Sequence, residues 1–161
     1  MDKLQKEINI YTDGSCNHEY GTGGWAAILI FDGREVLLKG MEPDTTQNRM
    51  ELLSVIRALE YIENQDLKNY KIIINSDSQY VVRLIDRKDK LQDTDFTTRK
   101  GGNIKNRDLV EKILNFMESM NLSFIKVKAH QGKSDTRNYN RDVDKISRKI
   151  VREDVRKNHP V

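Results

Sequence analysis

Four acidic residues occur in settings where a folded chain could gather them around divalent cations. Asp13 and Asp77 each follow an apolar run that is typical of a β-strand, in Tyr-Thr-Asp-Gly-Ser and Asn-Ser-Asp-Ser-Gln. Glu51 and Asp144 lie near the expected starts of two helices. Carboxylates that share a site repel one another unless a cation neutralises them, and Mg²⁺ prefers such oxygen ligands. Because two Mg²⁺ ions about 3.5–4 Å apart can clamp the attacking and leaving oxygens of a phosphodiester, the pattern predicts metal-dependent phosphodiester chemistry.

The composition is that of a globular protein in a reducing compartment. A chain of 161 residues is long enough to bury a core, so we expect a single domain over residues 1–161. The only cysteine, Cys16, excludes an internal disulfide. No apolar run approaches the roughly 20 residues that a membrane span needs, and the N-terminus lacks the apolar stretch of a signal peptide. We therefore expect a cytoplasmic protein that has no membrane partner.

The hydrophobic pattern predicts an α/β fold whose strands bring acids to one edge of a sheet. Apolar and alternating runs predict five strands, over residues 7–12, 23–31, 35–39, 70–75 and 123–128. Asp32-Gly33 is a hairpin signal, so the first three strands are expected to form an antiparallel meander. If the first and fourth strands are parallel neighbours, Asp13 and Asp77 meet where these strands end.

Apolar residues at helical spacing predict three amphipathic helices, which carry the other two acids. Their buried stripes are Leu52, Val55, Ile56, Leu59 and Ile62 in the first, Leu109, Ile113, Phe116, Met117 and Met120 in the second, and Val143, Ile146 and Ile150 in the last. Glu51 sits on the shoulder of the first stripe and can face the sheet. Ser78 is the expected cap of a short helix that runs to Ile85, and Asn140 the expected cap of the last helix. Residues 86–105 carry no clear pattern.

Positive charge is concentrated near the C-terminus. Between Lys126 and Lys157 there are 11 Lys and Arg residues against 5 Asp and Glu, although the whole chain has a net charge of only +3. Such a segment is either a surface that faces phosphates or the solvated face of a helix, and the composition fits both.

Five segments resemble, in order, the motifs of type 1 ribonuclease H. They are Tyr-Thr-Asp-Gly-Ser-Cys at 11–16, Thr-Gln-Asn-Arg-Met-Glu-Leu at 46–52, Ser-Asp-Ser-Gln-Tyr-Val at 76–81, Val-Lys-Ala-His-Gln-Gly at 127–132 and Asn-Arg-Asp-Val-Asp at 140–144. The resemblance implies the ribonuclease H-like fold, in which a five-stranded mixed sheet of three antiparallel and then two parallel strands is flanked by helices. Met1 shortly precedes the first strand, which favours a free-standing bacterial or phage-type enzyme over a domain of a reverse transcriptase.

The activity implied by this resemblance is endonucleolytic hydrolysis of the RNA strand in RNA–DNA hybrids. Asp13, Glu51, Asp77 and Asp144 would hold two Mg²⁺ ions, with Mn²⁺ as a possible substitute, and the products would carry 5′-phosphate and 3′-hydroxyl ends. His130 is similar to the family's loop histidine, which assists proton transfer and product departure. The expected partner is the hybrid alone, bound by a monomer that has no obligate protein partner.

The residues that would contact the hybrid by the same resemblance have short polar side chains or an accessible backbone: Gly14, Ser15, Cys16, Asn17, Thr46, Asn48, Gln79 and Asn106. Asn48 and Gln79 match positions that reach into the minor groove, where the 2′-hydroxyl distinguishes RNA from DNA, and Asn17 is a further candidate. Thr46 and Asn106 resemble the pair that grips a phosphate of the DNA strand. Asn106 is also a candidate cap of the helix that follows it. Contacts to the backbone carry no base code, so cleavage is expected to be largely independent of sequence.

Two segments depart from the family pattern. The loop at 17–22 lacks the usual proline-containing glycine-rich run. Residues 83–105 correspond to the basic, tryptophan-rich substrate handle of many bacterial members, but here basic and acidic residues are mixed and Phe96 is the only aromatic residue. Either the handle is weakened or the basic C-terminal helix shares its task. We expect looser and more salt-sensitive binding of hybrids, because fewer phosphate contacts remain.

Three other functions are compatible with parts of this pattern. A 3′–5′ exonuclease of related architecture normally carries Asp-x-Glu in its first strand, whereas Ser15 stands two residues after Asp13. A module that binds hybrids without cleaving them usually lacks one of the four acids. A purely structural α/β protein would not need the five motifs together.

Overall fold

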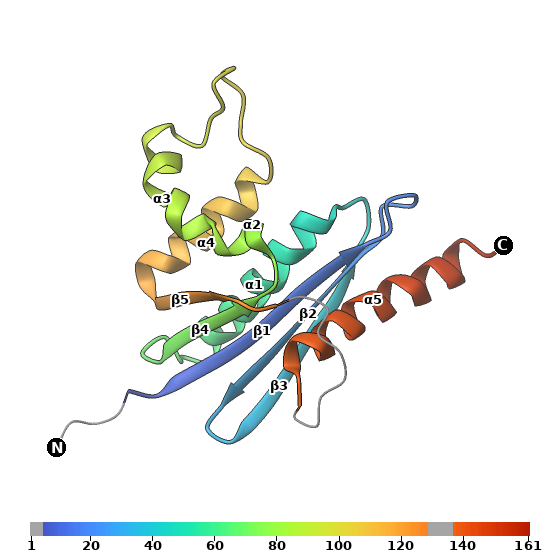
Figure 1. Ribbon diagram of the computed structural model, residues 1–161, viewed down its shortest axis with the longest axis horizontal. Coiled ribbons are helices and arrows are strands. Elements are labelled where there is room, and N and C mark those ends of the chain that lie inside the picture. The colour runs from blue at the N-terminus through green and yellow to red at the C-terminus, as the bar shows by residue number, and fades with distance from the viewer. Residues whose placement is uncertain (1–4, 129–136) are drawn as a thin grey trace.

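The computed structural model describes residues 5–128 and 137–161, and its centre is one mixed β-sheet (Figure 1). The strands are β1 (Glu7–Cys16), β2 (Gly23–Phe31), β3 (Arg34–Glu42), β4 (Lys71–Ser76) and β5 (Asn121–Lys126). They lie in the order β3-β2-β1-β4-β5. β1, β2 and β3 pair in antiparallel fashion, while β4 is parallel to both β1 and β5. The predicted sheet of three antiparallel and two parallel strands is therefore confirmed.

Helices cover both faces of this sheet, because the strands present apolar side chains on both. The helices are α1 (Gln47–Asn64), α2 (Gln79–Val82), α3 (Leu84–Asp93), α4 (Arg107–Ser119) and α5 (Tyr139–Asn158). Along β2, Ala27 and Leu29 belong to the large core that includes the apolar stripes of α1 and α4. Ala26 and Ile28 alternate with them and pack against Val143 of α5 in a second, smaller cluster. The main core thus lies between the sheet and α1, and α5 covers the opposite face.

The first strand continues beyond the point that the sequence predicts. The strand was expected to end at residue 12, but β1 runs on to Cys16 because β2 pairs with it along this stretch, with Asp13 opposite Ala26. On its other side β1 pairs with β4 only as far as Thr12 opposite Ser76. Asp13 and Asp77 are therefore the first residues beyond the last β1–β4 pair, on parallel neighbouring strands as expected.

Other element boundaries differ from the predictions by a few residues. β5 covers 121–126 instead of 123–128, because it pairs with β4 from end to end and β4 stops at Ser76. The short helix expected to end at Ile85 is two helices, α2 and α3, and the second continues to Asp93. The predicted cap, Ser78, is confirmed as the N-cap of α2, since its hydroxyl accepts a hydrogen bond from the amide of Val81.

The start of the last helix is also corrected. Asn140 was expected to be its cap, but the N-cap is Asn138, whose side-chain oxygen accepts from the amide of Arg141 at 3.1 Å. Asn138 has an extended backbone, as an N-cap requires, whereas Asn140 already lies in the first helical turn and is buried. Within 5–128 and 137–161, none of the helices combines the length and the apolar character needed to cross a membrane.

Candidate active site

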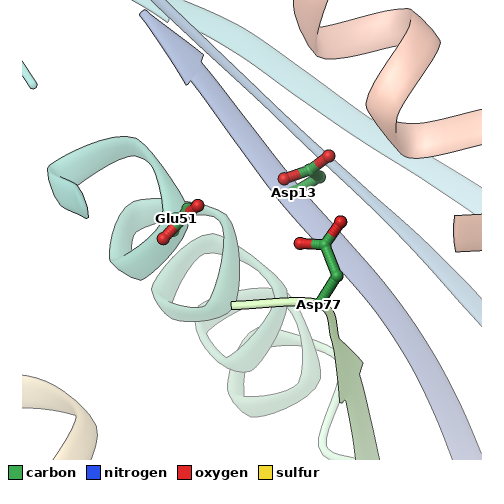
Figure 2. A group of neighbouring side chains, drawn as sticks. All are labelled: Asp13, Glu51 and Asp77. Atoms are coloured by element: carbon green, nitrogen blue, oxygen red, sulfur yellow. The ribbon is translucent and has the colours of Figure 1, made fainter. Parts of the chain in front are cut away.

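Three carboxylates from three separate segments of the chain meet where β4 ends (Figure 2). Asp13 comes from β1, Asp77 follows β4, and Glu51 lies in the second turn of α1. Each offers one oxygen, and these oxygens all lie within 4.8 Å of one another. The sheet brings Asp13 and Asp77 together, because parallel strands end at the same edge, while Glu51 approaches from the helix that packs on the sheet.

Gly14 allows α1 to lie directly against β1. A Cβ atom at this position would be 2.5 Å from the amide nitrogen of Glu51 and closer still to the carbonyl carbon of Met50, so no side chain fits. The carbonyl of Gly14 also accepts a hydrogen bond from the Gln47 side chain at 2.6 Å. This contact between backbones sets the separation between Glu51 and Asp13.

The Glu51 carboxylate is held at both of its oxygens. The Ser78 hydroxyl donates to Oε2 at 2.6 Å, and the Gln47 amide donates to Oε1 at 3.4 Å. Burial raises the pKa of Glu51, these two hydrogen bonds lower it, and the charge of Asp77 raises it again, for a net upward shift. Ser78 thus has two tasks, because the same hydroxyl that caps α2 orients a carboxylate of the site.

Asp13 is the most deeply buried acid of the group, with 5% of its surface exposed. The amide of Gly14 donates to its Oδ1 at 2.8 Å. Burial raises the pKa of Asp13 to about 8, and the charge of Asp77 adds to the shift, while the bond from Gly14 opposes it. Three acidic oxygens that are crowded and partly desolvated form a donor set that suits a hard divalent cation, since such a cation supplies the missing positive charge.

Asp144 approaches the same site from α5 but makes a contact of its own. It lines a cavity of about 580 Å³ together with Asp13, Glu51 and Asp77. It also interacts with Asp13, whose pKa it raises. Its Oδ1 pairs with Nε of Arg148 at 2.9 Å, one helical turn further along α5. The structure therefore places all four predicted acids around one cavity. Oxygens of three lie within 4.8 Å of one another, and the fourth, Asp144, interacts with Asp13 and pairs with Arg148.

The predicted substrate contacts lie in two groups around this cavity. Gly14, Ser15, Cys16 and Asn17 line it directly. The exposed residues lie at the starts of helices beside it: Thr46 is the N-cap of α1, Asn48 is in its first turn, and Gln79 begins α2.

Asn106 is the N-cap of α4, but its side chain does not cap the helix. Its backbone adopts the left-handed conformation with φ of 60°, which directs the side chain away from the helix amides. The amide oxygen instead accepts from Nη1 of Arg49 at 3.4 Å, and the amide nitrogen donates to the hydroxyl of Tyr80 at 3.3 Å. Arg49 in turn forms two hydrogen bonds with Asp108, at 3.0 and 2.8 Å. Asn106 is therefore joined to the N-terminal turn of α1, close to Thr46.

Several residues of the site were not predicted from the sequence to belong to it. Gln47 and Ser78 contact Glu51, and Arg148 and Arg152 line the cavity with Asp144. Two of them carry a local signal, since Gln47 precedes Glu51 by four residues and Arg148 follows Asp144 by four, the spacing at which helical side chains meet. Residue His130 lies outside the described residues, so its predicted role stays a prediction.

Comparisons with known proteins identify the family to which this chain is related. The model of the RNase H family matches residues 5–152. A ribonuclease H of Caldicellulosiruptor saccharolyticus is 39% identical over 150 residues, which cover 92% of this chain and 98% of the relative. Two solved structures share the fold. LC9-RNase H1 has a TM-score of 0.71 at 23% identity, covering 95% of this chain and 75% of that one. LC11-RNase H1 in complex with an RNA/DNA hybrid has a TM-score of 0.67 at 21% identity, covering 92% and 99%. The chain therefore belongs to the ribonuclease H family of enzymes.

Proposed function

We propose that this protein cleaves the RNA strand of RNA–DNA hybrids endonucleolytically, and that it uses two Mg²⁺ ions. The observation that carries the proposal is the group of three carboxylates in a chain of the ribonuclease H family. Asp13, Glu51, Asp77 and Asp144 would hold the ions. When bound, the ions would activate a water molecule and stabilise the leaving 3′-oxygen, so that products carry 5′-phosphate and 3′-hydroxyl ends. Mn²⁺ is a possible substitute, since it also accepts oxygen ligands.

The chain's own residues prepare this site before substrate arrives. Gly14 lets Glu51 approach Asp13, and Ser78 and Gln47 fix the direction of the Glu51 carboxylate. Ligands held in place by second contacts of this kind bind cations more tightly than free side chains, because less ordering is needed on binding. Asp144 would complete the site after its carboxylate leaves Arg148.

Recognition of the hybrid would come from polar groups around the cavity. Asn48, Gln79 and Asn17 are suited to contact the minor groove, where 2′-hydroxyls mark the RNA strand. Thr46 and Asn106 would bind a phosphate of the DNA strand, and the bridge from Arg49 to Asn106 supports this assignment because it joins the two segments. These contacts carry no base code, so cleavage should depend little on sequence. LC11-RNase H1, which shares the fold, has been solved with an RNA/DNA hybrid.

The remaining assignments follow from the family resemblance. His130 would move a proton during cleavage and help the product to leave. The chain would act as one domain and as a monomer in the cytoplasm, with the hybrid as its only obligatory partner.

The test uses a DNA duplex with an internal tract of RNA, labelled on the strand that contains the RNA. Purified protein with Mg²⁺ should make internal cuts confined to the RNA tract, and EDTA should abolish them. All-DNA and all-RNA duplexes serve as controls. Cuts that begin only at free 3′ ends would indicate an exonuclease, and binding without cuts would indicate a hybrid-binding module.

Two variants assign the roles within the site. Asp77→Asn removes a ligand charge with little change in volume, so it should abolish cleavage and leave hybrid binding within about threefold of wild type. His130→Ala should slow turnover and retain measurable activity, because a proton transfer to solvent remains possible. Cleavage by Asp77→Asn at the wild-type rate would refute the metal-site assignment.

A further inference from the structure

A row of arginines leads away from the carboxylates along α5. Arg148, Arg152 and Arg156 follow one another at intervals of four residues and are all exposed. Side chains at this spacing lie on the same side of a helix, one turn after another. The row therefore forms a continuous strip of positive charge that begins beside Asp144.

This strip borders two adjoining hollows of the surface. Arg148 and Arg152 line the cavity that contains the four acids. Arg152 and Arg156 line a second cavity of about 440 Å³, next to Val155 and His159 near the C-terminus. Arg152 and Asn17 belong to both cavities, so the two cavities adjoin at these residues.

The charges of Arg152 and Arg156 are not neutralised by acids among the residues that the structure describes. Arg148 pairs with Asp144, whereas neither Arg152 nor Arg156 forms an ion pair with the residues described by the structure. The acids next to them in the sequence are engaged elsewhere: Glu153 pairs with Lys149, and Asp154 accepts hydrogen bonds from Thr22 and Asn158. Two exposed guanidinium groups beside a hollow are suited to phosphate oxygens, which they can bind through two parallel hydrogen bonds.

The far end of the hollow is held in a defined shape. The ring of Tyr20 stacks on that of His159, with centroids 3.8 Å apart and planes 11° from parallel. The Thr22 hydroxyl donates to Asp154 at 3.0 Å. These contacts fasten the loop between β1 and β2, which carries Asn17, to the last turns of α5. The second cavity is therefore built from two segments fixed to each other.

We propose that Arg152 and Arg156 bind phosphates of the substrate's RNA strand on one side of the cleavage point. This inference rests on the proposed function, because the scissile phosphate of the RNA must lie at the carboxylates. The next phosphates of the RNA strand would then lie in the hollow beside Arg152.

The DNA strand is assigned to the opposite side, near Thr46 and Asn106. The segment 83–105 also lies on that side, far from the end of α5 (Figure 1). The arginines would thus supply phosphate contacts that this segment, with its mixed charges, lacks.

The experiment compares Arg152→Ala/Arg156→Ala with a matched double variant. Lys149→Ala/Lys157→Ala removes the same charge from the same helix, but neither lysine lines either cavity. Alanine is favoured in helices, so both variants should fold, which melting temperatures check. Binding of a fluorescent hybrid in EDTA is measured by anisotropy between 50 and 200 mM NaCl, and KM and kcat are measured with Mg²⁺.

The arginine variant should bind the hybrid about tenfold more weakly. The slope of log affinity against log salt concentration should be less negative by about 2, one for each lost phosphate contact. Its kcat should stay within twofold of wild type. The lysine variant should match wild type in affinity within twofold and in slope, and Arg152→Lys/Arg156→Lys should keep most of the slope. Equal loss in the arginine and lysine variants would overturn the proposal, since only net charge would then matter.

Uncharged methylphosphonate linkages locate the contact. Placed in the RNA strand just outside the cleavage point, on one side, they should weaken binding by wild type and have no further effect in the arginine variant. Sensitivity only to linkages in the DNA strand would refute the assignment to RNA. The two proposals fail separately: a wild-type protein that binds but does not cut would overturn the enzymatic function, whereas normal cutting with unchanged binding by the arginine variant would overturn this inference alone.

Discussion

Asp144 is paired with Arg148 at 2.9 Å, and the two residues are one turn apart on α5. The acid is one-quarter exposed and the arginine about half exposed. The pair is therefore partly open to water, which weakens its interaction, although Asp144 also interacts with Asp13 inside the cavity. A cation bound by Asp144 must compete with the guanidinium for the same oxygens.

Replacing Arg148 by glutamine removes this competitor. We expect Mg²⁺ to bind the nucleic-acid-free protein roughly threefold to tenfold more tightly, because a positive charge next to the site is lost while the exposure of the pair limits the effect. Isothermal titration calorimetry measures the affinity. Lys149→Gln, which removes a neighbouring charge that is paired with Glu153, is the control. Equal affinities for wild type and Arg148→Gln would mean that Arg148 does not restrain Asp144.

Ser78→Ala tests the support of Glu51. The variant loses the 2.6 Å hydrogen bond to the Glu51 carboxylate, and we expect the Mg²⁺ concentration for half-maximal cleavage to rise by about tenfold or more. It also loses the cap of α2, which should lower the free energy of unfolding by about 1 kcal/mol. Ser54→Ala is the matched control, since it removes a buried hydroxyl that donates to the backbone oxygen of Glu51 and leaves the carboxylate contacts intact. If both variants need the same Mg²⁺, the Ser78 contact does not orient Glu51.

Gly14→Ala tests the close approach of α1 to β1. The added methyl group would overlap the backbone at Met50 and Glu51, so the helix must move. We expect a loss of about 1–3 kcal/mol or more in the free energy of unfolding, and a fall in kcat of at least tenfold because Glu51 moves away from Asp13. Thermal unfolding and cleavage assays measure the two effects. Gly102→Ala, where the added methyl group meets nothing within 4 Å, should behave as wild type. A Gly14→Ala protein of unchanged stability would contradict the observed packing.

The pKa of Asp13 predicts how stability without metal depends on pH. Its pKa is about 8 in the folded protein against 3.8 for the free side chain. Between these values the folded protein keeps a proton that the unfolded chain has lost, so stability falls as pH rises from about 4 to about 8. In EDTA the free energy of unfolding should therefore be larger at pH 5 than at pH 8, by on the order of a few kcal/mol. The melting temperature should accordingly be higher at pH 5.

Two variants separate Asp13 from other acids in this measurement. Asp13→Asn should flatten the dependence on pH and be more stable than wild type at pH 8, because no charge is then buried at this position and the repulsion from Asp77 disappears. Asp89→Asn, which removes an exposed charge in α3, should follow wild type. Mg²⁺ should stabilise wild type most at pH 8, where the cation replaces the proton. A wild-type melting temperature that does not change between pH 5 and pH 8 would be inconsistent with this account.

The sequence alone was sufficient to predict the order of the five strands along the chain, the three long helices and the four acids. Each of these signals is local. The stripe of α1 follows from spacing along one helix, and Asp77 follows from an apolar run that ends three residues earlier, at Ile74. The five motifs also indicated the ribonuclease H family, because their order along the chain is itself part of the pattern.

What the sequence could not determine depends on contacts between distant segments. β1 continues past Asp13 because β2 pairs with it. Asp13-Gly14, a dipeptide that is common in turns, is therefore part of a strand. Ser78 reaches Glu51 across 27 positions of the chain, only after α2 packs beside α1. The second cavity lies between the β1–β2 loop and the end of α5, two segments that are joined through Tyr20 and His159. Local periodicity specifies which face of an element is buried, whereas the partner that buries it, and hence the shape of the site, is decided only when the layers pack.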